Sequence, residues 1–306
     1  MNEPNDAAGL RPLDDEALRR WPLPMPGTDG DKEQRGRVLV IGGSREIAGA
    51  VILAAVSALR AGAGKVAVAT GASVAQAVAV AVPEARVIGL PETVAGGLSP
   101  QGLDALGSLP ERAGAVLVGP GMQDDAATCA LVEALRPRLG RDTPLLLDAA
   151  AMSVVRRPDV GVPDAMRFDT PVLLTPHAGE MARLTGQDKD ALQARPHEAA
   201  RAAARRWNAV VAFKGATTYV ASPEGPVWRH DGGSIGLATS GSGDTLAGLI
   251  AGLAARGAPL DQACAWGVCL HARAGARLEG RFGPLGFLAR EIPAEVPALM
   301  HALAPR

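Results

Sequence analysis

Short, continuous runs of aliphatic residues, separated by longer segments of helical pattern, most strongly limit the folds open to this chain. A strand that is apolar at every position is buried on both faces, whereas an alternating strand has one face in water. Continuous strands that alternate with helices are typical of a parallel sheet covered on both sides. We therefore predict an α/β fold of three layers, with a mostly parallel central sheet. The runs are Val38–Ile41, Val66–Val68, Val116–Val118, Leu145–Leu147, Val172–Leu174 and Val210–Phe213.

The segments between these runs predict the helical layers. In Asp244–Arg256, leucines and Ile250 recur at helical spacing on one face, and Gly257 marks the C-terminal stop. The alanine- and valine-rich segment Ala72–Val82 predicts at most a buried helix, because it is shorter than the roughly 18 apolar residues that a membrane span needs. Further helices are predicted at Gly49–Ala61, Thr128–Arg136 and Leu260–Leu278, and a hairpin at Tyr219–Trp228.

Prolines set the start of the chain apart. Five of them fall within residues 1–36, and each fixes its own backbone and lacks an amide donor. We predict an irregular lead-in over residues 1–36, with one short helix around Asp14–Arg20, followed by a single domain over residues 37–306. Met1–Leu10 lacks the apolar core of a secretory signal, so we expect a cytoplasmic protein.

Net charge and cysteine spacing indicate which kinds of binding partner this chain lacks. The formal net charge is −1, so no overall field attracts nucleic acid or an anionic membrane, and we expect neither as a partner. The three cysteines are scattered and lack metal-ligand spacing. We expect them to be buried thiols, and the sequence alone names no metal ligands.

Polar or glycine-rich residues follow five of the predicted strands. Ligands of open parallel sheets bind at the carboxyl ends of the strands, so this clustering outlines a candidate site. Turns also favour such residues, so one cluster alone would say little. The clusters are Gly42-Gly43-Ser44, Gly119-Pro120-Gly121, Asp148, Thr175-Pro176-His177 and Lys214-Gly215.

The sharpest motif is Gly241-Ser242-Gly243-Asp244, at the start of a predicted helix. Glycines let the backbone approach a ligand closely, and the free amides of a helix start attract anions. Asp244 could simply cap the helix, but a cap needs no glycine run before it. We favour a phosphate site in which Asp244 acts as general base on a hydroxyl that attacks phosphorus. The motif is not a Walker loop, because no Gly-Lys-Ser/Thr follows.

A second candidate is Lys214-Gly215-Ala216-Thr217-Thr218, which offers a cation, a flexible turn and two hydroxyls. The segment is either a turn into the predicted hairpin or a contact for the phosphate or ribose of a nucleotide. Spacing alone leaves both interpretations open.

These stretches resemble the ribokinase-like superfamily and, within it, the ADP-dependent NAD(P)H-hydrate dehydratases. The most specific block is Thr175-Pro176-His177-Ala178-Gly179-Glu180, which sugar kinases of the superfamily lack, whereas the Gly241–Asp244 block marks only the superfamily. The resemblance implies a ribokinase-like fold and a repair reaction. ADP would phosphorylate the C6 hydroxyl of a hydrated nicotinamide ring, and phosphate would then leave to restore NADH or NADPH.

The resemblance also implies roles for individual residues. Asp244 would take the hydroxyl proton, and the amides of Gly241–Gly243 would stabilise the transferring phosphoryl group. The hydrated dinucleotide would contact Ala50, Gly121 and His177 together with Asp244. The adenine nucleotide would contact Lys214, Gly215, Ala216, Thr217, Thr218 and Gly243, with Mg²⁺ bridging its phosphates. Family analogy suggests a homo-oligomer.

The sequence departs from the family pattern in three places. The family's lysine-glycine approach to the first strand is only loosely matched by Lys32-Glu33-Gln34-Arg35-Gly36. Ala150 stands where the family commonly has Asp, and Ser234 stands where it commonly has Asn. Two alternatives stay open. One is a small-molecule kinase of the same fold, against which the Thr175–Glu180 block argues, and the other is a catalytically silent nucleotide-binding protein, which the departures at Ala150 and Ser234 suggest.

Overall fold

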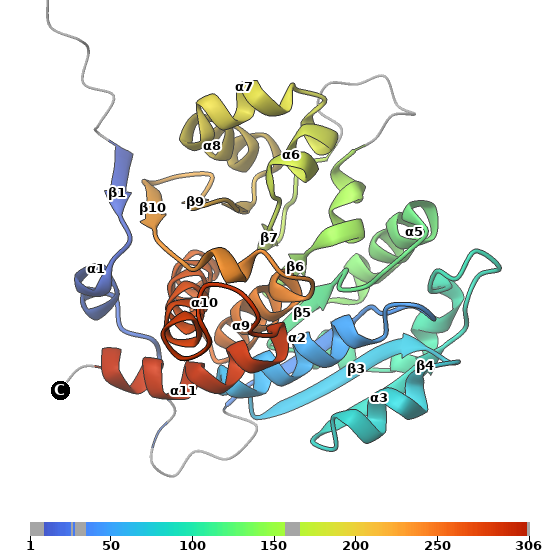
Figure 1. Cartoon of the computed structure of the whole chain (residues 1–306). Coiled ribbons are helices and arrows are strands. Elements are labelled where there is room, and N and C mark those ends of the chain that lie inside the picture. Colours follow the sequence, from blue (N-terminus) through green and yellow to red (C-terminus); the bar gives the residue numbers. More distant parts are fainter. Residues whose placement is uncertain (1–8, 26, 28–34, 157–165, 305–306) are drawn as a thin grey trace, which may run out of the picture.

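A computed structural model describes residues 9–25, 27, 35–156 and 166–304 (Figure 1). One ten-stranded sheet runs through this part of the chain, in the strand order β1-β10-β9-β8-β7-β6-β5-β2-β3-β4. The strands are β1 (Leu10–Pro12), β2 (Arg37–Ile41), β3 (Lys65–Gly71), β4 (Ala85–Leu90), β5 (Ala115–Val118), β6 (Leu145–Leu147), β7 (Val172–Leu174), β8 (Val210–Phe213), β9 (Thr217–Ala221) and β10 (Val227–Asp231).

The sheet is mostly parallel, as the sequence predicts. The strands from β8 to β4 run parallel to one another, and all six predicted strands lie among them. The predicted hairpin is β9–β10, which pairs antiparallel to β8 through β9. Beyond it, β1 pairs parallel to β10 at the edge of the sheet.

Helices cover both faces of this sheet, which confirms the three-layer architecture (Figure 1). One apolar core lies between the sheet and α2 (Gly49–Arg60), α9 (Ser242–Ala255), α10 (Leu260–Phe282) and α11 (Ile292–Leu303). The other lies under α5 (Asp125–Leu135), α6 (Ala178–Thr185), α7 (Lys189–Ala194) and α8 (Pro196–Trp207). The remaining helices are α1 (Asp15–Arg20), α3 (Ala75–Ala81), α4 (Leu109–Arg112) and the 3-10 turns η2 (Pro100–Leu106), η3 (Arg136–Arg138), η4 (Ala149–Val155), η5 (Ile235–Leu237) and η6 (Ala289–Glu291).

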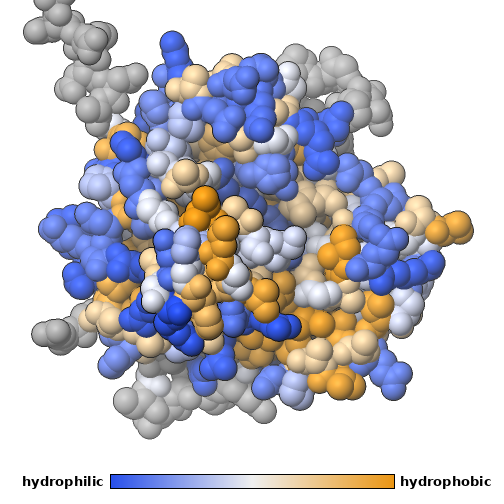
Figure 2. All heavy atoms as spheres, in the orientation of Figure 1, coloured by the Kyte–Doolittle hydropathy of each residue, from blue (hydrophilic) through white to orange (hydrophobic). Residues whose placement is uncertain are grey.

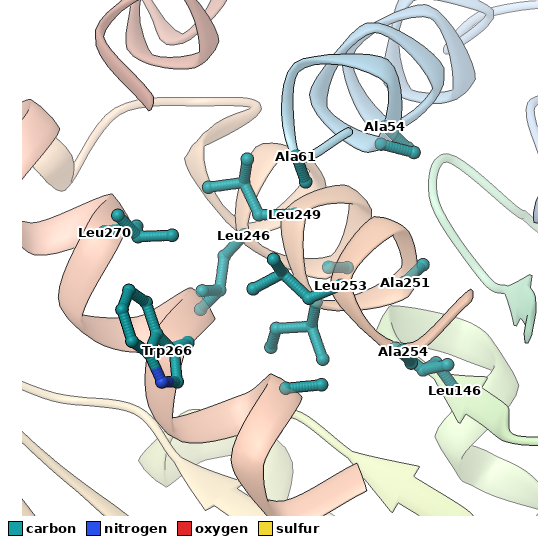
Figure 3. Packing of buried hydrophobic residues seen from close by; sticks show 14 of the residues in the cluster. Ala54, Ala61, Leu146, Leu246, Leu249, Ala251, Leu253, Ala254, Trp266 and Leu270 are labelled. Atoms are coloured by element: carbon teal, nitrogen blue, oxygen red, sulfur yellow. The ribbon is translucent and has the colours of Figure 1, made fainter. Parts of the chain in front are cut away.

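Helix α9 packs against α2 at unusually short range. A Cβ atom added at Gly248 would lie 2.2 Å from the carbonyl oxygen of Ala54, and one at Gly252 would lie 2.5 Å from that of Ala58. Only glycine allows the two backbones to approach this closely. Leu246 and Leu253 of α9 point toward Trp266 and Leu270 of α10, and Ala254 lies beside Leu146 of the sheet (Figure 3).

Two strands differ from the sequence-based expectations. β4 was not predicted, because Arg86 and Gly89 interrupt its apolar pattern. The lead-in is not wholly irregular: α1 lies where a short helix was predicted, but Leu10–Pro12 also joins the sheet as β1. Residues 1–8, 26 and 28–34 of the lead-in lie outside the described residues.

The helix expected within Ala72–Val82 is α3, and it is mostly exposed, with Val78 as its buried residue. Figure 2 shows apolar atoms gathered at the lower right, over α3. No helix within the described ranges combines the length and the apolar character that crossing a membrane requires. Of the cysteines, Cys264 and Cys269 are buried as expected, and Cys129 is half-buried.

The α2–α9 contact predicts that Gly248→Ala destabilises the fold. The new methyl group would meet a backbone carbonyl, so the helices must separate, at a cost of at least about 1–3 kcal/mol in the free energy of unfolding. The control is Gly280→Ala on the exposed side of α10, where a Cβ meets nothing within 4 Å. This change should leave stability unchanged or raise it by up to about 1 kcal/mol, because Ala favours helix. Urea unfolding of both variants measures the difference, and equal midpoints would contradict the packing argument.

Candidate active site

The carboxyl ends of four neighbouring strands bring the predicted motifs together. β5, β6, β7 and β8 lie side by side, with Val118 paired to Leu147 and Leu147 paired to Leu174. The residues that follow these strands therefore emerge along one edge of the sheet. They are Gly119–Gly121, Asp148, Thr175–His177 and Lys214, and they match the clusters identified in the sequence.

Lys214 follows β8 and forms ion pairs with two acidic side chains at this edge. Its Nζ atom lies 3.4 Å from Oδ1 of Asp148 and 4.0 Å from Oε2 of Glu180. The Thr175 hydroxyl donates to the same Asp148 oxygen. The Lys214 side chain is only 20% exposed, so solvent screens its charge incompletely.

His177 begins α6 and lies on the strand end beside Lys214. The Lys214 amide donates to the carbonyl of Pro176 over 2.8 Å, so the two main chains are bridged. Nδ1 of His177 accepts from the amides of Gly179 and Glu180, and the His177 amide donates to Oε2 of Glu180. Because Nδ1 is an acceptor, the neutral ring carries its proton on Nε2, and the exposed imidazole can donate to a ligand.

The Gly241–Asp244 motif forms the first turn of α9, as predicted. Gly241 is the N-cap, with φ of +87°, a conformation that favours glycine. At Gly243, an added Cβ would lie 3.6 Å from Nζ of Lys214, which places the ammonium group beside the helix start. The amides of this turn and the Lys214 charge therefore face a common space.

Asp244 is a half-buried carboxyl in this space. Burial, reinforced by the charge of Asp148 and opposed by that of Lys214, raises the pKa of Asp244 to about 7. The group is therefore poised to exchange a proton near neutral pH.

Ala50 and Gly121 lie next to each other at the start of α2. A Cβ added at Gly121, whose φ is +66°, would lie 2.7 Å from Cβ of Ala50. One turn further along α2, Leu53 contacts Gly241, since a Cβ there would lie 2.4 Å from Cδ1 of Leu53. Helix α2 thus links this pair to the head of α9. Ala50 itself is buried, at 3% exposure.

The segment from Gly215 to Thr218 turns from β8 into β9, which confirms the hairpin interpretation. The Thr217 hydroxyl donates to Oδ1 of Asp231 over 2.9 Å. A nucleotide contact by Gly215, Ala216, Thr217 and Thr218 stays a prediction, since a turn can also present its amides to a ligand.

Sequence reasoning grouped Asp148 with the candidate site but gave no individual role to Asp148, Glu180 or His271. Asp148 and Glu180 do stand in stretches that resemble the family. Glu180 also follows His177 at the three-residue spacing of a capping box. His271 lies within α10, and its Nε2 is 3.0 Å from Oγ of Ser242. Burial lowers the pKa of His271 to about 4, so a neutral imidazole supports the first turn of α9.

Ser234, one of the departures from the family pattern, has a structural role. It is the N-cap of η5, and its hydroxyl accepts from the amide of Gly236 over 3.0 Å. Asn is an equally good cap residue, so this exchange preserves the local backbone.

The charge pattern predicts opposite shifts of the Asp244 pKa in two variants. Asp148→Asn removes a negative neighbour and should lower the pKa below its wild-type value near 7. Lys214→Met removes a positive neighbour and should raise it. ¹³C NMR titration of the aspartate carboxyls measures both shifts. A pKa that stays fixed in both variants would mean that these charges do not act on Asp244.

Comparison with known proteins agrees with this geometry. Residues 38–298 match the family model described as NAD(P)H-hydrate dehydratase. The chain is 50% identical, over 96% of its length and 97% of the relative's, to an ADP-dependent (S)-NAD(P)H-hydrate dehydratase from Xanthomonas campestris. It is 38% identical, over 93% of its length, to the bifunctional NAD(P)H-hydrate repair enzyme Nnr of Moorella thermoacetica, of which it spans 53%.

Solved structures agree as well. A Bacillus subtilis ADP/ATP-dependent NAD(P)H-hydrate dehydratase, co-crystallised with ATP and Mg²⁺, matches with a TM-score of 0.76 and 28% identity over 95% of this chain and 98% of that one. A hydroxyethylthiazole kinase from Pyrococcus horikoshii shares the fold, with a TM-score of 0.56 and 17% identity over 90% of this chain and 91% of that one. With the family model covering most of the sequence and the same motifs gathered at one sheet edge, the chain belongs to the NAD(P)H-hydrate dehydratase family.

Proposed function

We propose that this chain is an ADP-dependent dehydratase that converts the (S)-hydrates of NADH and NADPH back to the intact cofactors. The observation that carries the proposal is the half-buried Asp244 carboxyl, with a pKa of about 7, beside Lys214 and the first turn of α9. The 50% identical relative of the same name supports the substrate assignment.

The reaction has two parts. The C6 hydroxyl of the hydrated ring attacks the terminal phosphorus of ADP, its proton leaves, and AMP departs as the phosphoanhydride bond breaks. The C6–O bond of the new phosphate ester then breaks, a proton leaves the neighbouring ring carbon, and the ring double bond re-forms. The net products are the reduced cofactor, AMP and inorganic phosphate.

Asp244 is the proposed general base for the first part. An efficient base has a pKa near the operating pH, so that it is deprotonated and still accepts a proton readily. An aspartate with an unperturbed, lower pKa would be a weaker base. Burial and the negative charge of Asp148 raise the pKa of Asp244 and so make it a stronger base.

The head of α9 and Lys214 supply electrostatic stabilisation. The free amides of Gly241–Gly243 and the partial positive charge of the helix start favour an anion. The Lys214 ammonium lies beside Gly243 and adds a full charge. These groups are in place before the reaction, so they can stabilise charge on the moving phosphoryl group without reorganising.

We assign the hydrated dinucleotide to the side of the edge formed by Ala50, Gly121 and His177. Gly121 is partly exposed where it packs against Ala50, and the imidazole of His177 offers an Nε2 donor. Lys214–Thr218 and Gly243 would hold the adenine nucleotide.

The residues at the site fit a Mg²⁺ ion that is bound mainly through phosphate and water. Among the described residues, no group of three or more His, Cys, Asp or Glu side chains is placed to hold a metal by itself. Mg²⁺ often uses only one or two carboxylates together with phosphates, and Asp148 and Glu180, both near Lys214, are the carboxylates that would hold its waters. When bound, the ion would neutralise charge on the nucleotide phosphates.

Asp244→Asn should abolish turnover while the fold stays intact. Loss of a general base lowers kcat by about 10²–10⁴-fold. Folding raises the pKa of Asp244 to about 7, so its contribution to the free energy of unfolding is lost as pH rises through about 7. At pH 8 wild type carries a partly buried charge that the variant lacks, so the variant should be at least as stable as wild type. Steady-state assays and thermal unfolding at that pH measure both effects.

Asp190→Asn, on the exposed surface of α7, is the matched control and should behave as wild type in both measurements. Near-normal turnover by Asp244→Asn would remove this carboxyl from the chemistry.

The substrate assignment is tested with purified protein, Mg²⁺ and hydrated NADH. We expect ADP to restore the absorbance of the reduced nicotinamide, with one AMP formed for each cofactor recovered; a parallel reaction with ATP tests the choice of nucleotide. Phosphorylation of an unrelated alcohol instead would favour the kinase alternative, and nucleotide binding without turnover would favour a silent binding protein.

The cellular setting stays a prediction. We propose a cytoplasmic homo-oligomer, by analogy with the family. Sedimentation velocity of the purified chain tests the oligomer, and a single monomeric species at micromolar concentration would contradict it.

A further inference from the structure

We propose that the chain has a second binding site, for a small molecule that carries a diphosphate group, at the edge of the sheet opposite Asp244. A cavity of about 470 Å³ lies beside the amino ends of β2, β3 and β4 and beneath α4. The catalytic motifs follow the carboxyl ends of the strands, so this cavity is separated from them by the length of the sheet. Nothing in the proposed reaction uses it.

The cavity is strongly basic. Among the residues that the structure describes, four cationic side chains and one acidic side chain, that of Glu84, line it. The chain as a whole has a formal net charge of −1, so this concentration of positive charge is local. The cations are Arg37, Lys65, Arg86 and Arg112.

The strand register places these cations on one face of the sheet. Arg37 pairs with Lys65, and Arg86 pairs with Ala67, two residues beyond Lys65. Neighbours in register point to the same face of a sheet, and residues two apart on a strand share a face. Arg112 comes from α4, whose Leu109 packs on the core of that same face.

This arrangement favours an anionic ligand. A bound polyanion would gain favourable charge interactions with several of these side chains at once. Arg37 and Lys65 also have other interactions within the chain, so discrimination for the ligand depends mainly on the exposed Arg86 and Arg112. Guanidinium groups bind phosphate oxygens in a bidentate geometry, which favours phosphate over a carboxylate of lower charge.

The size of the cavity and the apolar part of its wall indicate what can be attached to the diphosphate group of the ligand. Its volume falls within the roughly 300–1,000 Å³ typical of small-molecule sites. Part of the wall is apolar, from Leu39, Ala67 and Leu109. A free oligophosphate would use the cations alone, whereas a nucleoside diphosphate would also place its base on the apolar wall.

Hydrogen–deuterium exchange locates binding and separates this site from the catalytic one. The full chain is titrated with pyrophosphate in one series and with ADP in another. We expect slower exchange over residues 64–67, 84–86 and 109–113. In the double variant Arg86→Glu and Arg112→Glu, the same protection should require at least about tenfold more ligand, a loss of about 1.4 kcal/mol.

The matched control changes Arg141 and Arg205 to Glu. Both are exposed and neither lines the cavity, so the control has the same net charge and should bind as wild type. Turnover should be unchanged in both double variants, because none of these arginines lies at the catalytic edge. If charge reversal disturbs folding, as judged by the unfolding midpoint, Arg86→Gln with Arg112→Gln replaces it.

Each result decides the proposal. Protection at this edge by ADP at lower concentration than pyrophosphate supports a nucleotide site, and the reverse order supports a free oligophosphate site. Protection confined to residues 214–218 and 241–244 overturns the proposal. So does protection at the amino-end edge that is equal in wild type and in the Arg86 and Arg112 variant.

Discussion

The close contact between α2 and α9 is the constraint on which the catalytic edge depends. Carbonyl groups of α2 lie where side chains at Gly248 and Gly252 would be, so α9 is held against a second helix at backbone distance. The same two helices contact each other again at the amino end of α9, where Leu53 of α2 touches Gly241. The first turn of α9 therefore has little freedom to move relative to Ala50 and Gly121. Rigid placement of this turn is what an electrostatic catalyst requires.

A second constraint is the imbalance of charge at the strand ends. Lys214 is the cation near which Asp148, Glu180 and Asp244 gather, and it forms its closest ion pair with Asp148. Burial of Asp244, reinforced by the charge of Asp148 and only partly offset by that of Lys214, raises its pKa to about 7. The neutral His271 behind Ser242 adds no further positive charge. The same arrangement raises the pKa of Asp244 and keeps the Lys214 ammonium group beside the first turn of α9.

The sequence predicted most of the fold because the buried parallel strands carry continuous aliphatic runs. It missed β4, where Arg86 and Gly89 break the run, and β1, whose three residues carry no periodic signal. Asp244, Lys214 and His177 could be grouped in advance, since each follows a strand or opens a helix at the same sheet edge. His271 could not, because its partner Ser242 is 29 residues away and only the packing of α10 on α9 brings them together. The basic cavity was equally hidden, since its residues are ordinary surface arginines until the register aligns them.

The central claim is that a base with a pKa near 7 at the head of α9 accepts the proton of the substrate hydroxyl. The pH dependence of kcat/KM for dehydration by the wild-type chain tests this most directly, because it reports the pKa of the free enzyme's base. The account predicts a rate that rises with pH along a limb centred near 7, where Asp244 loses its proton. A rate that stays constant from neutral pH down to about pH 5, as an unperturbed aspartate would give, would contradict it.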